Sequence, residues 1–134
     1  MQAKLNRRNF LRAAAAGVGS LSALSACGQS AAAANKPLRV ALIGCGGRGT
    51  TLLPELCKER VVALVDPDRR QFAGALGAIR KADPQADVAA IKTFADYRKL
   101  FDELGKELDA VVIATPNHQH ALPALLAIRR GIHV

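Results

Sequence analysis

Apolar runs without alternating polar positions recur along the chain after residue 37. Such runs, rich in branched residues, are typical of strands buried on both faces of a parallel sheet. The runs are residues 38–43, 61–65, 88–91 and 108–114. Segments with helical periodicity lie between or after them, at 50–59, 68–81, 96–104 and 121–130. This alternation predicts an α/β fold with a doubly wound parallel sheet of about four strands and the start of a fifth at 132–134.

Several residues mark where the predicted helices begin and end. Asp68 and Asp96 stand where an N-terminal capping residue is expected. Pro123 falls in the first turn of the last helix, where proline is tolerated. Gly105 and Gly131 follow the last apolar positions of their helices, so we expect both to act as helix stops.

The first strand runs directly into a glycine-rich turn, Gly44-Cys45-Gly46-Gly47-Arg48-Gly49, with the pattern G-x-G-x-x-G. In this pattern the first glycine allows a tight turn, the second lets the backbone approach a pyrophosphate, and the third lets the helix pack closely on the strand. The N–H groups at the helix start also favour phosphate. The candidate cofactor-binding residues are therefore Gly44, Gly46, Gly47, Arg48 and Gly49. The alternative is a glycine turn in a domain that binds no nucleotide.

An acidic residue, Asp66, ends the second strand. It lies 22 residues after Gly44, near the usual spacing for a carboxylate that accepts hydrogen bonds from the adenosine ribose hydroxyls. A carboxylate repels a 2′-phosphate, so Asp66 favours NAD over NADP. Arg69, which we count as a further cofactor-binding candidate, and Arg70 follow closely and could neutralise such a phosphate. NADP is therefore not excluded, and the alternative for both arginines is a solvated helix face.

A second polar segment, Ala114-Thr115-Pro116-Asn117-His118-Gln119-His120, follows the last long apolar run. Ligands of open parallel sheets sit at the carboxyl ends of the strands, near the point where the strand order reverses. Thr115 and Asn117 can hydrogen-bond a ribose or an amide, and Pro116 fixes the turn. His118 and His120 would point the same way in an extended segment, but their spacing does not identify a metal pair. The alternative is that Asn117 and the histidines simply start the next helix.

Composition narrows the class of protein. The chain has 134 residues, of which 50% are hydrophobic and only 4% aromatic, so the core must be aliphatic and a stacking platform for nucleic acid is not expected. The net charge of +8 falls to +4 without the four basic residues of the first twelve, and the remaining positive charges are scattered. No nucleic-acid partner is therefore predicted. The three cysteines show no metal-binding spacing, and Cys45 is expected to be a small filler.

The first 27 residues are typical of an export signal. Paired arginines, Arg7 and Arg8, followed by Asn9-Phe10-Leu11 resemble the twin-arginine motif, and a mildly apolar stretch too short to span a bilayer follows. Leu24 to Cys27 resembles a lipobox, which would make Cys27 a lipidation site; the alternative is ordinary cleavage near Ala32 to Ala34. We expect a signal peptide at 1–27, a linker at 28–37 and a nucleotide-binding domain at 38–134. The protein is then exported through the Tat machinery, to the periplasm or to the outer side of the membrane through the lipid.

Three stretches together resemble one known family. VALIGCGGRG, VDPD and ATPNHQHALPALLAIRRGIHV, with their spacing, resemble the nucleotide-binding half of the Gfo/Idh/MocA family of NAD(P)-dependent oxidoreductases. The resemblance covers about Leu38 to Val134. It implies a Rossmann domain and hydride transfer between nicotinamide and a carbon of a sugar or cyclitol. It also implies that Gly44, Gly46 and Gly49 hold the pyrophosphate and Asp66 the ribose, and that Thr115, Pro116, Asn117 and His120 lie along the cofactor.

The resemblance also implies features beyond the matched stretch. In the family, the segment after G-x-H-V carries Glu-Lys-Pro, whose lysine is central to catalysis, and a larger α/β domain then holds the substrate and often the oligomer interface. The sequence in hand stops at Val134. We therefore expect a front portion without the catalytic centre, and a homo-oligomer for the longer protein. The runner-up hypothesis is a non-catalytic nucleotide-binding fragment.

Overall fold

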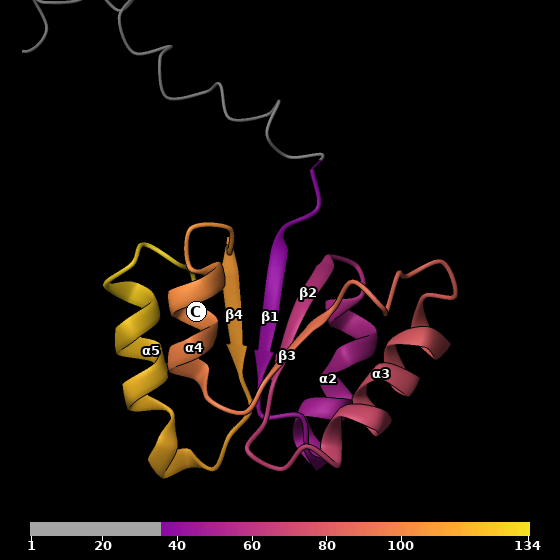
Figure 1. Cartoon of the computed structure of the whole chain (residues 1–134), viewed down its shortest axis with the longest axis horizontal. Coiled ribbons are helices and arrows are strands. Elements are labelled where there is room, and N and C mark those ends of the chain that lie inside the picture. The colour runs from indigo at the N-terminus through magenta and orange to yellow at the C-terminus, as the bar shows by residue number, and fades with distance from the viewer. Residues whose placement is uncertain (1–35) are drawn as a thin grey trace, which may run out of the picture. The chain divides into compact units, whose positions relative to one another are not determined.

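Four parallel strands form one sheet in a computed structural model that describes residues 36–134 (Figure 1). The strand order is β3-β2-β1-β4. The strands are β1 (Arg39–Ile43), β2 (Arg60–Val65), β3 (Lys92–Phe94) and β4 (Ala110–Ile113). This order confirms the predicted doubly wound parallel sheet, since the chain moves outward from β1 to β3 and then crosses back to the other side of β1.

The register places the carboxyl ends of the strands at one edge, the lower edge of the sheet in Figure 1. Ile43 at the end of β1 lies beside Val65 on one side and Ile113 on the other. The polar segments that follow β1, β2 and β4 therefore start close together. The reversal of strand order lies between β1 and β4, which is where open α/β sheets bind ligands.

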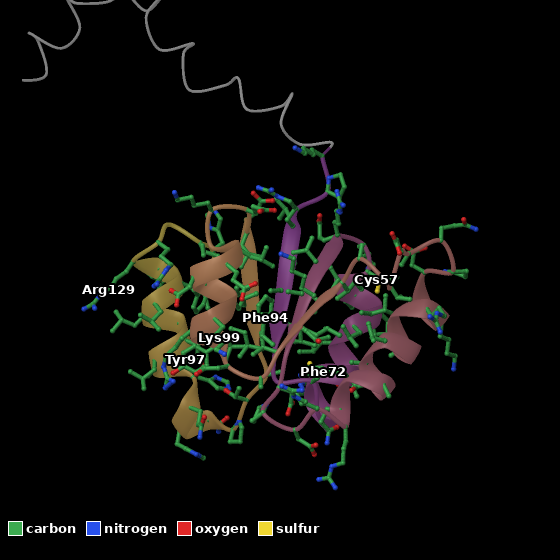
Figure 2. The ribbon with its side chains drawn as sticks, viewed as in Figure 1. Cys57, Phe72, Phe94, Tyr97, Lys99 and Arg129 are labelled. Atoms are coloured by element: carbon green, nitrogen blue, oxygen red, sulfur yellow. The ribbon has the colours of Figure 1, made fainter. Side chains whose placement is uncertain are left out.

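Helices cover both faces of the sheet (Figure 1). The helices are α2 (Gly47–Leu56), α3 (Gln71–Ala82), α4 (Tyr97–Leu104) and α5 (Ala121–Ile128), with a short 3₁₀ helix η2 (Asn117–Gln119) before α5. The first pair, α2 and α3, packs on one face of the sheet, and the second pair, α4 and α5, packs on the other. Each face is apolar because successive side chains of a strand point to opposite faces. In Figure 2, Cys57 and Phe72 lie on the α2 and α3 side, whereas Phe94 and Tyr97 lie on the α4 and α5 side.

Two apolar clusters, one on each face, make the core. Leu42 and Leu64 pack with Leu53 of α2 and Ile79 of α3. On the other face the neighbouring strand residues pack with α4, α5 and the residues that follow them. The residues of this second cluster are Ala41, Ile43, Ala63, Val65, Phe94, Leu100, Phe101, Leu104, Leu108, Val111, Ala127 and Ile132. Burial of successive residues of β1 confirms the interpretation of the apolar runs as strands covered on both faces.

The capping predictions hold for α4. Asp96 is its N-cap, and the Asp96 side chain accepts a hydrogen bond from the backbone N–H of Arg98. Gly105 follows the last helical residue, Leu104, as predicted. Gly131 has a φ of +73°, a conformation that suits glycine at a helix end.

The third strand was predicted at the wrong place. Residues 88–91 form an irregular turn whose Val88 and Ile91 pack against the α2 and α3 side of the core, and the strand is Lys92–Phe94. The apolar-run rule fails here because β3 has only three residues, of which only Phe94 is buried. β4, at the other edge of the sheet, does carry an apolar run. The helix α2 also begins three residues earlier than predicted, inside the glycine motif, because Gly46 serves as its N-cap. Asp68 is not the N-cap of α3, which is Arg70, but its carboxylate accepts a hydrogen bond from the backbone N–H of Arg70 just before the helix, so Asp68 does act near the N-cap.

Past α5 the chain returns to the sheet. His133 forms an isolated parallel bridge with Ala110, so only the beginning of the predicted fifth strand is present. No helix in residues 36–134 is long and apolar enough to cross a membrane. The predicted signal sequence, including Arg7, Arg8 and Cys27, lies outside the described residues.

Candidate functional site

Two glycines of the loop are required by the packing of the protein itself. Gly44 has a φ of +94°, and a Cβ there would lie 2.8 Å from the carbonyl carbon of Ala114. A Cβ on Gly49 would lie 1.9 Å from the carbonyl oxygen of Gly44. The positive φ of Gly44 fits the predicted tight turn, and the close approach of α2 at Gly49 to Gly44 and Leu42 fits the predicted packing of the helix on the strand. The contact of Gly44 with the segment after β4 was not predicted.

Gly46 and Gly47 are different, because the protein leaves room for a side chain at both. A Cβ on Gly46 would have its nearest neighbour, Oε1 of Gln71, at 3.9 Å, and a Cβ on Gly47 would meet nothing within 4 Å. Gly46 also has an ordinary backbone conformation, with φ −69° and ψ −179°. Since neither packing nor strain requires glycine here, the open space above these two residues fits the close approach of a ligand.

The N-terminus of α2 opens onto the same space. Gly46 offers no side-chain cap, and the first turn carries no acidic residue. The first N–H groups of a helix have no intrahelical partner, and the helix dipole adds partial positive charge. The loop itself is held by the hydroxyl of Thr50, which donates to the carbonyl oxygen of Cys45 at 2.6 Å. The result is a fixed, uncapped set of donors suited to a phosphate.

Asp66 ties the glycine loop to the turn after β2. One carboxylate oxygen accepts from the backbone N–H of Cys45 and the other from that of Asp68, both at 2.8 Å. The side chain is almost buried, with 8% of the residue exposed. Each oxygen has a second lone pair, so the arrangement leaves capacity to accept from a ribose hydroxyl. The sequence predicted such a contact, but gave no signal for the bond to Cys45.

The thiol of Cys45 is part of this packing. It is fully buried, and burial together with the charge of Asp66 raises the pKa of the Cys45 thiol to about 12. This agrees with the predicted role of Cys45 as a filler rather than a nucleophile. Cys45 and Cys57 are both free thiols, and no group of three histidine, cysteine or acidic residues within 36–134 is placed to hold a metal.

The two arginines after Asp66 differ in their partners. Arg70 forms an ion pair with Asp68 at 2.9 Å. The hydrogen bonds from the Arg70 side chain and backbone lower the pKa of Asp68 to about 2. Arg69 is exposed and borders an open hollow of about 410 Å³ whose charged lining is mixed, with Lys92 and Lys99 beside Asp96 and Glu103. Of the two arginines, Arg70 is therefore the one engaged with Asp68, whereas Arg69 lines this hollow.

The segment after β4 folds back on itself. Thr115 is followed by a 3₁₀ turn of Asn117 to Gln119, and the ring Nε2 of His120 lies 2.6 Å from the carbonyl oxygen of Thr115. The segment is thus not extended, and His118 is exposed while His120 is partly buried. Pro116 and Asn117 are exposed at the turn.

The hydroxyl oxygen of Thr115 is buried and has no hydrogen-bond partner. A hydroxyl without a partner is costly, which fits a group that a bound ligand completes.

The structure therefore brings most of the predicted residues to one edge of the sheet. Gly44 of the glycine loop lies against the backbone of Thr115, and the carboxylate of Asp66 accepts a hydrogen bond from the backbone N–H of Cys45 in the same loop. Sequence reasoning missed Thr50 and Gln71, which support and border the loop from α2 and α3. A separate hollow of about 390 Å³ lies at the opposite, amino-terminal end of β2, lined in part by Cys57, Arg60 and Asp83. None of the predicted site residues borders it.

Comparison with known proteins identifies the family. The model of the Gfo/Idh/MocA family, described as an oxidoreductase family with an NAD-binding Rossmann fold, matches residues 38–134. The chain belongs to this family. The match confirms the resemblance drawn from the three sequence stretches, and it confirms NAD as the cofactor of the family.

Two curated relatives have similar sequences. A glycosyl hydrolase family 109 protein of Stenotrophomonas maltophilia is 34% identical over 140 residues, which cover 97% of this chain and 29% of that protein. Inositol 2-dehydrogenase 4 of Saccharopolyspora erythraea is 32% identical over 104 residues, which cover 75% of this chain and 28% of that protein. The chain therefore spans less than a third of the length of these relatives.

Solved structures share the fold. Scyllo-inositol dehydrogenase from Lactobacillus casei, solved with NAD(H) and scyllo-inositol, superposes with a TM-score of 0.58 at 18% identity, covering 74% of this chain and 27% of that one. UDP-N-acetylglucosamine 3-dehydrogenase from Acidithiobacillus ferrooxidans superposes with a TM-score of 0.54 at 22% identity, covering 72% of this chain and 28% of that one. These likenesses confirm the Rossmann-like fold.

Proposed function

We propose that residues 38–134 form the NAD-binding part of an oxidoreductase that transfers a hydride between nicotinamide and a sugar or cyclitol carbon. The observation that carries the proposal is the space left open above Gly46 and Gly47 beside the uncapped start of α2. A dinucleotide needs close backbone approach and unpaired donors at this point. The family match and the inositol dehydrogenase among the relatives support the substrate class.

In this proposal, the residues that bind the cofactor follow the carboxyl ends of three neighbouring strands. The N–H groups at the start of α2 bind the pyrophosphate, and Asp66 after β2 orients the adenosine ribose. Thr115 after β4 meets the nicotinamide half, because the dinucleotide crosses β1 from one neighbouring strand to the other. When bound, the nicotinamide ring supplies the hydride acceptor or donor. The chain itself binds and orients.

Asp66 favours NAD over NADP in this proposal, because its carboxylate is held in place by two backbone donors and cannot turn away from a 2′-phosphate. Arg69 is the residue that would soften this preference, since Arg70 is paired with Asp68. A direct comparison of the two cofactors by calorimetry tests the point. We expect tighter binding of NAD, and equal affinities would contradict the assignment of Asp66.

The binding proposal is tested by titrating the 134-residue chain with NAD⁺ and following backbone amide signals by NMR. We expect the largest shifts at Gly46 to Gly49 and at Thr115. A Gly46→Val variant, whose side chain fills the open space, should lose binding, whereas Gly74→Ala on α3, with nothing within 4 Å of its added Cβ, should retain it. Saturating NAD⁺ without any shift at the glycine loop would overturn the proposal.

Catalysis is tested in the longest protein that the reading frame encodes. We expect reduction of NAD⁺ with a cyclitol or sugar as the donor. A second candidate is hydrolysis of a glycosidic bond, favoured by the 34% identity to a family 109 protein over 97% of the chain. If a hydride is removed and later returned, no net reduction accompanies bond cleavage. Release of a phenol from an aryl glycoside without NADH accumulation would therefore favour hydrolysis. A frame that ends at Val134 and a protein inactive in both assays would favour the runner-up, a non-catalytic nucleotide-binding fragment.

We also propose that the protein is exported in folded form and anchored through a lipid on Cys27. The paired Arg7 and Arg8 and the lipobox-like Leu24 to Cys27 support this. An Arg7→Lys, Arg8→Lys variant should remain in the cytoplasm, as measured by cell fractionation. Cys27→Ala should abolish incorporation of labelled palmitate while export continues; unchanged labelling would contradict the lipid anchor. The homo-oligomer implied by the resemblance stays a prediction.

A further inference from the structure

The contact between His120 and Thr115 joins the two ends of the turn after β4. The ring Nε2 of His120 lies 2.6 Å from the carbonyl oxygen of Thr115. A carbonyl only accepts hydrogen bonds, so the ring must carry its hydrogen on Nε2 and donate it. The backbone of His120 is fixed as well, because its N–H donates to the carbonyl oxygen of Asn117 and its carbonyl accepts from Ala124 at the start of α5.

Thr115 is held on its other side by the glycine loop. A Cβ on Gly44 would lie 2.9 Å from the backbone nitrogen of Thr115, so the two backbones are in direct contact. The N–H of Ala114 donates to the carbonyl oxygen of Ile43 at 2.7 Å, which continues the pairing of β1 and β4 up to this point. The backbone of Thr115 therefore contacts the glycine loop on one side and the ring of His120 on the other.

The side chain of Thr115 is the part that lacks a partner. Its hydroxyl oxygen is buried and makes no hydrogen bond. Its location after β4, across β1 from Asp66, places it on the nicotinamide side of the proposed site. A small rotation of the Thr115 backbone would redirect this hydroxyl, and the bond to His120 opposes that rotation.

We propose that His120 is a positioning residue, which holds the Thr115 carbonyl and so keeps this turn beside the nicotinamide-ribose half of the dinucleotide, whose binding gives the buried Thr115 hydroxyl the partner that it lacks. This inference rests on the proposed NAD-binding function. It differs from the sequence-based expectation that His120 itself lies along the cofactor, since the ring Nε2 of His120 is engaged with the carbonyl oxygen of Thr115. Its consequence is selective: loss of His120 weakens binding of the nicotinamide half and spares the adenosine half.

The test measures dissociation constants for NAD⁺ and for ADP, which lacks the nicotinamide riboside, in the 134-residue chain. His120→Ala should weaken NAD⁺ binding about tenfold, the effect of losing one hydrogen bond, and leave ADP within about twofold. His120→Gln, whose amide N–H can replace the donor, should recover most of the NAD⁺ affinity. The matched control is His118→Ala, two residues away and exposed, which should change neither constant.

A double-mutant cycle shows whether His120 acts through Thr115. Thr115→Val removes the hydroxyl but keeps the carbonyl. If His120 serves the hydroxyl, the double variant should bind NAD⁺ no more weakly than the weaker single variant, whereas independent effects would multiply. Multiplying effects, or equal weakening of NAD⁺ and ADP in His120→Ala, would overturn the inference while the proposed function stands. Failure of the unmodified chain to bind either ligand would instead refute the proposed function and the inference with it.

Discussion

Replacing glycines of the loop one at a time separates those that serve the fold from those that serve the ligand. In Gly49→Ala the new methyl would lie 1.9 Å from the carbonyl oxygen of Gly44 and 2.9 Å from its carbonyl carbon. The first distance is much shorter than an ordinary van der Waals contact, which is about 3.5 Å. Because the opposing atoms belong to the backbone of a turn pinned by β2 and β4, neither side can yield without breaking pairing.

This geometry sets the expected loss of unfolding free energy in Gly49→Ala. Overpacking costs about 1–3 kcal/mol, and the clash with backbone places Gly49→Ala at the upper end. For a domain of this size, about 3 kcal/mol lowers Tm by roughly 12–24 °C. In Gly46→Ala the methyl has its nearest neighbour at 3.9 Å and the backbone is extended, so the change in unfolding free energy should stay within about 1 kcal/mol.

The assay is thermal unfolding followed by circular dichroism, with and without NAD⁺. At a concentration ten times Kd, a ligand stabilises the folded state by about 1.4 kcal/mol, which raises Tm by roughly 6–11 °C. The unmodified chain should show this rise. Gly46→Ala should melt near the unmodified chain without NAD⁺ and lose the rise with it. Gly49→Ala melting within a few degrees of the unmodified chain, or Gly46→Ala keeping the full rise, would refute the reasoning.

Three further predictions follow from capping, burial and exposure. Asp96→Ala removes the N-cap of α4 and should lower the unfolding free energy by about 1 kcal/mol, whereas Asp96→Ser should retain most of it; urea titration measures both. In native protein, iodoacetamide should label Cys57 faster as pH rises from 8 to 10 and leave Cys45 unlabelled, because burial raises the pKa of the Cys45 thiol to about 12. The Cys45 thiol of the unfolded chain ionises near pH 9, so ionisation favours the unfolded state between about pH 9 and 12. Over this range the fold should therefore lose stability. Peptide mapping of the labelled sites and melting curves against pH check these outcomes. Leu122→Gln with Ile128→Gln, at two positions each 63% exposed on α5, should change the unfolding free energy by less than about 0.5 kcal/mol per site, as measured by urea titration.

The strands that the sequence predicted correctly are those covered by helices on both faces of the sheet. β1, β2 and β4 are covered by helices on both faces, so each leaves a continuous apolar run. β3 lies at the sheet edge and presents Lys92 and Thr93 to solvent, and its short polar sequence gives no such run. The apolar residues Val88 and Ile91 instead cover one side of the core from an irregular turn, which mimics a strand in sequence.

At the site, the sequence predicted which residues meet but not how they hold one another. The topology places Gly44, Asp66 and Thr115 at neighbouring strand ends, and that follows from the order of elements. The bond from Cys45 to Asp66 and that between His120 and Thr115 depend on local turn geometry, for which these residues carry no periodic signal. The spacing of His118 and His120 suggested a shared direction only for an extended segment, and the 3₁₀ turn removes that premise.

The double role of Asp66 changes how a substitution there should be interpreted. Its carboxylate joins the glycine loop to the turn after β2 through two backbone donors, in addition to any contact with a ribose. Hydrogen bonds to a charged acceptor contribute about 1.5–3 kcal/mol each, so removing Asp66 would disturb the pyrophosphate loop as well as the ribose contact. Loss of NAD⁺ binding in such a variant would therefore not identify which contact matters. Changing the ligand instead leaves the loop intact, and a weaker affinity for NAD⁺ that lacks the adenosine 2′-hydroxyl would isolate the ribose contact alone.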